Sequence, residues 1–156
     1  MRRLFYLLVV LLVSLPINAV ERKEIALDSI GLKVVCCTEQ VHWLYDATNA
    51  ITSSDPLDCD PESLRTEIVV EQGKLYINKG TEDEKSFKIN SCNFCEGKVF
   101  SDSGNVEVFS FVCTDVDENT VAITYQKVSG KGMTHNIVTV PSYDNYGCLT
   151  RVTTYR

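Results

Sequence analysis

Residues 106–113 (VEVFSFVC) and 120–128 (TVAITYQKV) decide the fold class of this chain. In the second stretch bulky apolar residues alternate with small or polar ones, which places Val121, Ile123 and Tyr125 on one face. This period of two is typical of a β-strand with one buried face. The first stretch is apolar on both faces. We therefore expect a strand that is covered on both sides, within a closed or two-layered β structure.

Short β-like runs of the same kind fill most of the remaining chain, separated by turn signals that contain Gly, Asn or Asp. Further strands are predicted at residues 64–71, 74–78, 86–90, 98–100, 136–140 and 149–154. Helical spacing occurs once, at residues 37–49, and residues 48–62 form a long irregular segment rich in Ser, Asp and Pro. The sequence predicts an all-β fold, either an antiparallel β-barrel stabilised by disulfides or, as the alternative, a two-sheet β-sandwich.

The first 19 residues have the pattern of a secretory signal peptide. Arg2 and Arg3 precede an apolar run at residues 4–15, and Ala19 ends a candidate cleavage site. The run is shorter than the ~20 apolar residues that a membrane span requires. We therefore expect a single secreted, extracellular β domain at residues 20–156, without a membrane span.

The charge of this domain limits its partners. Without Arg2 and Arg3, 13 basic residues stand against 21 acidic ones, which gives a net charge of −8. Such a surface repels nucleic acid and anionic lipid. We expect no nucleic-acid partner, whereas a neutral or basic partner is acceptable.

All seven cysteines fall within the predicted domain, and in a secreted chain most cysteines are paired in disulfides. The disulfide candidates are Cys36, Cys37, Cys59, Cys92, Cys95, Cys113 and Cys148. Six of them can pair, and the seventh is either buried or able to link a dimer. Cys92 and Cys95 have C-x-x-C spacing, but no βαβ unit surrounds them, so bridges to different strands are the favoured interpretation.

Motifs of catalysis and metal binding are missing from the sequence. It contains no G-x-S-x-G, P-loop or H-E-x-x-H, and His42 and His135 lie in no recognisable motif. Residues 115–126 begin like a calcium loop, but Thr120 and Gln126 stand where Gly and Glu are required. We expect a protein that is not an enzyme and that holds no cofactor or metal.

The segment Tyr143-Asp144-Asn145-Tyr146 resembles the second motif of the lipocalins, and Trp43 resembles the Trp of their first motif. Val41-His42-Trp43 has the Trp of that Gly-x-Trp motif, but Val41 stands in place of the Gly. The resemblance implies a secreted β-barrel in which Trp43, Tyr143 and Tyr146 are structural and close one end. In the simpler interpretation the two tyrosines are strand formers that flank a turn.

These features predict a non-enzymatic binding protein that carries a small hydrophobic or amphipathic ligand within its strands. The expected cavity lining is apolar, and its candidate residues are Phe87, Phe100, Phe109, Phe111, Ile123 and Tyr125. The alternative is a secreted, disulfide-rich β-sandwich that binds an extracellular protein through its surface, by means of the segment 48–62 and exposed turns.

Overall fold

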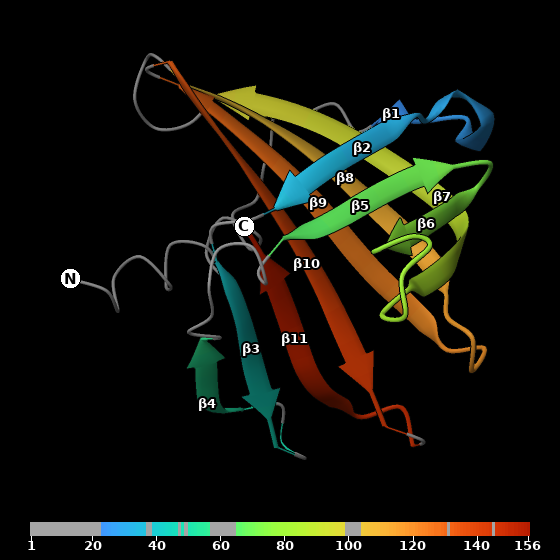
Figure 1. The fold of residues 1–156 in the computed structure, drawn as a ribbon, viewed down its shortest axis with the longest axis vertical. Coiled ribbons are helices and arrows are strands. Elements are labelled where there is room, and N and C mark those ends of the chain that lie inside the picture. Colours follow the sequence, from blue (N-terminus) through green and yellow to red (C-terminus); the bar gives the residue numbers. More distant parts are fainter. Residues whose placement is uncertain are drawn as a thin grey trace.

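The structure is a computed structural model that describes residues 23–36, 39–46, 48, 50–56, 65–98, 104–130, 132–144 and 146–156. Within these residues eleven strands form one antiparallel sheet (Figure 1). The strands are β1 (Lys23–Glu24), β2 (Leu32–Cys36), β3 (Gln40–Tyr45), β4 (Ile51–Pro56), β5 (Thr66–Glu71), β6 (Lys74–Ile77), β7 (Lys85–Lys98), β8 (Gly104–Thr114), β9 (Thr120–Gly130), β10 (Met133–Tyr143) and β11 (Leu149–Tyr155), and a short 3-10 helix, η1 (Leu27–Ser29), follows β1. The prediction of an all-β, antiparallel fold is confirmed, whereas the predicted signal peptide lies outside the described residues.

The strands follow the order β2-β5-β6-β7-β8-β9-β10-β11-β3-β4, and β1 is added at β7. From β5 to β11 each strand therefore pairs with the next one along the chain, as short turns allow. The alternation predicted from the sequence is present: Val121, Ile123 and Tyr125 of β9 are buried, while Ala122 between them is exposed.

Three segments differ from the predicted elements. The break expected between residues 90 and 98 is absent, because Asn93 and Phe94 of β7 pair with β1 on one side and β8 on the other. The segment with helical spacing contains β3, which pairs with β11 and β4. The segment 48–62, expected to be irregular, contains β4.

The two ends of the sheet are connected by the chain itself. β2 pairs with β5 at one end of the strand order, and β3, which follows after three residues, pairs with β11 near the other end. The backbones of Glu39 and Arg156 hydrogen bond in both directions, and their side chains form an ion pair of 2.6 Å. No pairing joins β2 to β4 in the part of the chain that the structure describes. The hydrogen-bonded ladder is therefore not closed into the predicted barrel, and one sheet stands in place of the two of the alternative sandwich.

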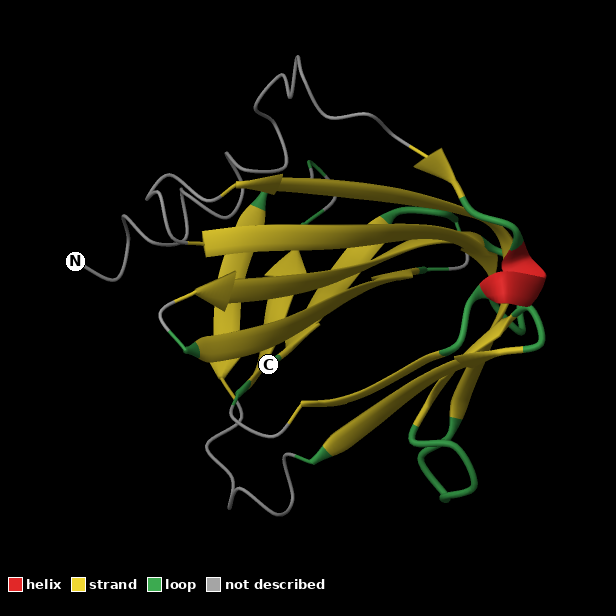
Figure 2. Cartoon of the chain, turned by 90° about the horizontal axis from the view of Figure 1, so that it is seen from above, coloured by secondary structure: helices red, strands yellow, loops and turns green. Residues whose placement is uncertain are grey.

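The sheet folds over itself, as Figure 2 shows, and the strand pairings place the bend within β7. Residues at the start of β7 pair with β6, residues after Lys88 pair with β8, and the register shifts between Ile89 and Ser91. The arm formed by β2, β5 and β6 thus packs over the longer strands, and β2 contacts β10. Such a bulge is a known device for bending a sheet.

The core lies between the arm and the long strands, on what we call the inner face. Its most completely buried members include Ile68, Leu75, Phe111, Ile123 and Val138, each at most 1% exposed. Burying side chains of this size contributes roughly 1.5–3 kcal/mol each. The inner face therefore supplies most of the driving force for folding.

Three turns at the lower edge of Figure 1, at residues 46–50, 115–119 and 144–148, share one construction, and we call them together the turn edge. In each turn the first residue is Asp (Asp46, Asp115, Asp144), and its Oδ1 accepts backbone N–H bonds from residues two and four positions later, over 2.8–3.1 Å. Its own N–H donates to the carbonyl of the fifth residue. One carboxylate therefore organises each turn, which is the usual role of Asp in turns.

The cysteines do not form the predicted framework in the part of the chain that is described. No disulfide joins any two of the described cysteines, and Cys37 and Cys59 lie outside the described residues. Cys92 and Cys113 are fully buried on the inner face, while Cys148 is exposed at the turn edge. Burial raises the pKa of the Cys92 thiol to about 11 and, together with the proximity of Cys92, that of the Cys113 thiol to about 12.

Candidate functional site

The structure gathers the predicted cavity residues into the hydrophobic core. Phe87, Phe111, Ile123 and Tyr125 are buried there, and Phe109 packs against them, while Phe100 lies outside the described residues. The rings contact each other, since the Phe109 centroid lies 5.8 Å from that of Tyr125 and 6.2 Å from that of Phe111. The Phe94 ring, which is not among the predicted cavity residues, has its centroid 4.8 Å from that of Phe109. These side chains fill space between the layers by packing on one another.

The three aromatic residues predicted to be structural have different surroundings. Tyr143 packs against the core. Trp43 is half-buried and is paired with Val152, on the face of the sheet opposite to buried Thr153. Tyr146 is 91% exposed at the turn edge, so the expectation that its ring packs against the fold is wrong. The reason is that the turn is made by hydrogen bonds to Asp144 and by the positive φ of Gly147, and neither uses the Tyr146 ring.

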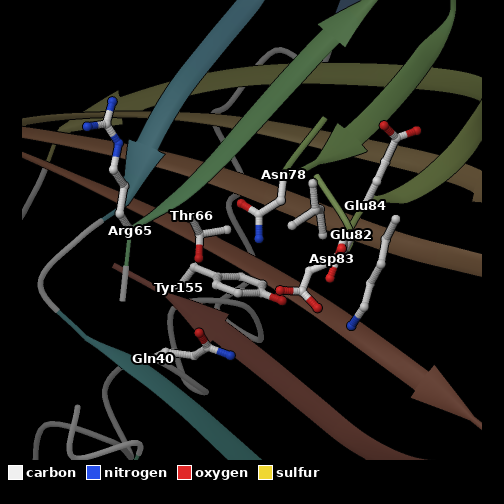
Figure 3. A pocket seen from close by; sticks show the side chains of 10 residues that line it. Gln40, Arg65, Thr66, Asn78, Glu82, Asp83, Glu84 and Tyr155 are labelled. Carbon is white, nitrogen blue, oxygen red and sulfur yellow. The ribbon is translucent and has the colours of Figure 1, made fainter. Parts of the chain in front are cut away.

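A pocket of about 460 Å³ lies where the arm of the sheet faces β3 and β11, and we call it the seam pocket (Figure 3). Gln40 of β3 and Tyr155 of β11 line it on one side. On the other side it is lined by Arg65 and Thr66 at the start of β5, Ile77 of β6 and the β6–β7 loop that follows. The pocket thus lies between the arm of the sheet and the β3–β11 pair.

The floor of the seam pocket is buried. Thr66, Ile77 and Tyr155 are each at most 5% exposed, and Ile77 and Tyr155 belong to the core cluster. Burial raises the pKa of the Tyr155 phenol, the proximity of Cys36 adds to this rise, and Arg151 opposes it. The phenol therefore stays neutral at ordinary pH, and its hydroxyl can both donate and accept a hydrogen bond.

The loop at residues 78–84 is held in place by hydrogen bonds from its first residue. Asn78 adopts a φ of 54°, its N–H donates to the carbonyl of Glu67, and its Oδ1 accepts the N–H of Glu67 at 3.0 Å. Thr81 donates both its N–H and its hydroxyl to the carbonyl of Asn78. With Oδ1 occupied, the Asn78 amide nitrogen points into the pocket (Figure 3). The loop is therefore arranged in advance of any binding.

A row of polar side chains continues from the pocket along β3. Gln40 Nε2 lies 3.4 Å from His42 Nε2, and His42 Nδ1 lies 3.0 Å from the hydroxyl of buried Thr153. These contacts hold the side-chain amide of Gln40 in place, and Gln40 is the residue of β3 that lines the pocket.

The seam pocket was not predicted from the sequence, because its residues come from segments around positions 40, 65, 80 and 155. The polar cluster at residues 81–85 (TEDEK) by itself predicts only a separator between two strands. The signal that could have drawn attention to them is the Asn-x-Gly at residues 78–80, followed by three acidic residues in succession.

Comparison with known proteins gives no family for this chain: it matches no protein-family model, no curated protein and no solved structure. The lipocalin resemblance therefore stays a prediction. Among the described residues, no group of three or more His, Cys, Asp or Glu side chains is arranged to hold a metal ion. In the same residues, no helix has the length and hydropathy needed to cross a membrane.

Proposed function

We propose that this chain is a secreted, non-enzymatic binding protein that takes a small amphipathic ligand in the seam pocket. The observation that carries the proposal is the combination of a buried floor and a polar rim in a pocket of about 460 Å³. Small-molecule sites in proteins usually measure ~300–1,000 Å³, and this pocket has that size, with eight polar or charged residues among the ten that line it. A lipocalin-like fold remains part of the proposal, although its strand ladder is open between β2 and β4 in the described residues, and the seam pocket replaces the purely aromatic cavity expected from the sequence.

The arrangement favours an amphipathic ligand over a purely apolar one. Ile77 and the Tyr155 ring offer an apolar surface at the floor, while Gln40, Asn78 and the loop 78–84 present polar groups around it. A ligand with an apolar body and one polar end can satisfy both. Because the loop is already hydrogen bonded, ordering it costs little on binding.

Calorimetric titration with octylamine, octanol and octanoate tests the proposal, because the three compounds share one apolar chain and differ in the polar end. We expect one-to-one binding of at least one of them, and a loss of that binding in Gln40→Trp, which fills the pocket. Thr150→Trp, at an exposed position of β11, is the matched control and should bind as the unmodified protein does. Mass spectrometry of an organic extract of the protein from its natural fluid provides an independent measurement. Absence of binding by all three compounds, together with an empty extract, would overturn the proposal.

The second candidate function is binding of an extracellular protein, and exposed apolar side chains at the turn edge favour it. Tyr146 is 91% and Val116 80% exposed, and the three turns contain five acidic residues and no basic one. Exposed aromatic residues are frequent energetic centres of protein interfaces. A stoichiometric partner recovered from extracellular fluid, and lost with Tyr146→Ser but retained with Thr150→Ser, would support it. Retention of the partner by Tyr146→Ser and Val116→Ser would exclude the turn edge.

A further inference from the structure

The loop 78–84 brings three acidic residues in succession, Glu82, Asp83 and Glu84, to the seam pocket. Glu84 is partly committed to the loop, because its Oε2 accepts the N–H of Gly80 at 2.6 Å. The Asp83 carboxylate points into the pocket, as does the Tyr155 ring that carries the phenol hydroxyl (Figure 3). Among the ion pairs of the described residues, none involves Asp83. A carboxylate without an internal cation is thus available to a ligand.

The basic residues at the pocket offset the negative charge of Asp83 and its acidic neighbours only in part. Arg65 and Lys85 are exposed, and no ion pair within the described residues joins either of them to the acidic loop. In Figure 3 the Arg65 side chain points away from Tyr155. The rim therefore carries three carboxylates and two cations, and Arg65 and Glu84 both point away from Tyr155 (Figure 3). The local field favours a positive group over a negative one.

We propose that the seam pocket selects ligands whose polar end is a cation, such as a protonated alkylamine, with Asp83 as the charged partner and Tyr155 as a neutral hydrogen-bond acceptor beside it. The proposal rests on the proposed function, since it specifies the ligand class of the same pocket. An ammonium group has three N–H donors and no acceptor, which matches a carboxylate and a phenol oxygen. Its apolar chain lies against Ile77 and the Tyr155 ring at the buried floor.

The same three octyl compounds test this ligand class, because octylamine is protonated at neutral pH, octanol is neutral and octanoate is anionic. We expect octylamine to bind about tenfold more tightly than octanol, as one charge-assisted hydrogen bond provides, and octanoate to bind most weakly. Asp83→Asn keeps the shape of the side chain and removes its charge. It should weaken octylamine about tenfold and leave octanol within about twofold.

Asp117→Asn is the matched control, because Asp117 is an exposed acidic residue of the turn edge and its carboxylate lies outside the pocket. It should leave all three affinities unchanged. Raising the salt concentration should weaken octylamine and spare octanol, since added ions screen a partly exposed ion pair. Circular dichroism confirms that the loop variant is folded.

The outcomes separate the two proposals. Tightest binding by octanoate, or an octylamine affinity that Asp83→Asn does not change, would overturn the cation preference and leave the ligand pocket in place. Failure of all three compounds to bind, together with an empty organic extract, would overturn the ligand pocket itself.

Discussion

The inner face and the turn edge are fixed by different forces, although the same strands run from one to the other. On the inner face the side chains decide: Phe111, Ile123 and their neighbours pack against one another between the layers. At the turn edge the backbone decides: one aspartate carboxylate in each turn accepts two backbone N–H groups. The chain can therefore change many tip residues while keeping the turn, but few core residues while keeping the sheet.

Cysteines lie in both regions, and the largest expected difference between the regions is the rate at which their thiols are alkylated. A pKa raised from 9 to about 11 lowers the thiolate fraction of Cys92 about a hundredfold, and burial also shields Cys92 and Cys113 from reagents. Exposed Cys148 should react with iodoacetamide at pH 8 at least about a hundredfold faster than either. Peptide mapping after timed labelling gives the three rates. Equal rates in the folded protein would show that the inner face is open to solvent.

Truncating an aromatic side chain should separate the two regions by stability. Phe111→Ala removes a ring that is 1% exposed, and we expect a loss of ~3–5 kcal/mol in the free energy of unfolding. Tyr146→Ala removes a ring that is 91% exposed and should change it by less than ~0.5 kcal/mol. Urea denaturation followed by circular dichroism measures both. A large loss from Tyr146→Ala would restore the structural role expected from the sequence.

At the turn edge the aspartate should matter more than the aromatic residue beside it. Asp144→Ala leaves the N–H groups of Tyr146 and Cys148 without their acceptor, and we expect a loss of ~1–2 kcal/mol. Asp144→Asn keeps an acceptor oxygen and should cost less than half as much as Asp144→Ala. Asp117→Ala, an exposed control, should stay within ~0.5 kcal/mol. Similar losses from Asp117→Ala and Asp144→Ala would contradict the role of Asp144.

The sequence predicted the inner face well because one strong signal determines it. Alternation in 120–128 identified the buried side chains of β9, and the stretch 106–113, with apolar residues on both faces, identified β8. The prediction of a break between residues 90 and 98 was wrong. Asn93 and Gly97 are poor strand formers, but strands on both sides of β7 supply hydrogen-bond partners in this stretch. Partners of that kind are tertiary, so a local pattern does not contain them.

The candidate site was harder to predict for the same reason. Thr66 and Tyr155 are 89 positions apart in the sequence and line one pocket because the arm folds over the long strands. The aromatic residues chosen from the sequence were apolar enough for a cavity, but apolar side chains at facing positions of two packed layers fill the space between them. Polar residues of a loop show no periodicity, so no sequence pattern near Asn78 or Asp83 indicates that they lie beside the buried floor of a pocket.

The smallest expected effect is a pH dependence at the first turn of the turn edge. Three hydrogen bonds hold the pKa of Asp46 below its ordinary value of 3.8: the hydroxyl of Thr48 first, at 2.6 Å, then the N–H groups of Ala50 and Thr48. Because the pKa is lower in the folded state, the contribution of Asp46 to stability is complete above pH 3.8 and is lost as the pH falls through the folded value. Thr48→Ala removes the largest cause and should move the Asp46 pKa back towards 3.8, whereas Thr150→Ala at the neighbouring hairpin should not. Carboxyl carbon shifts followed by NMR titration from pH 2 to pH 6 measure both. An Asp46 pKa that is the same in the two variants would mean that the backbone N–H groups alone set it, and the three turns would then differ only in their exposed tips.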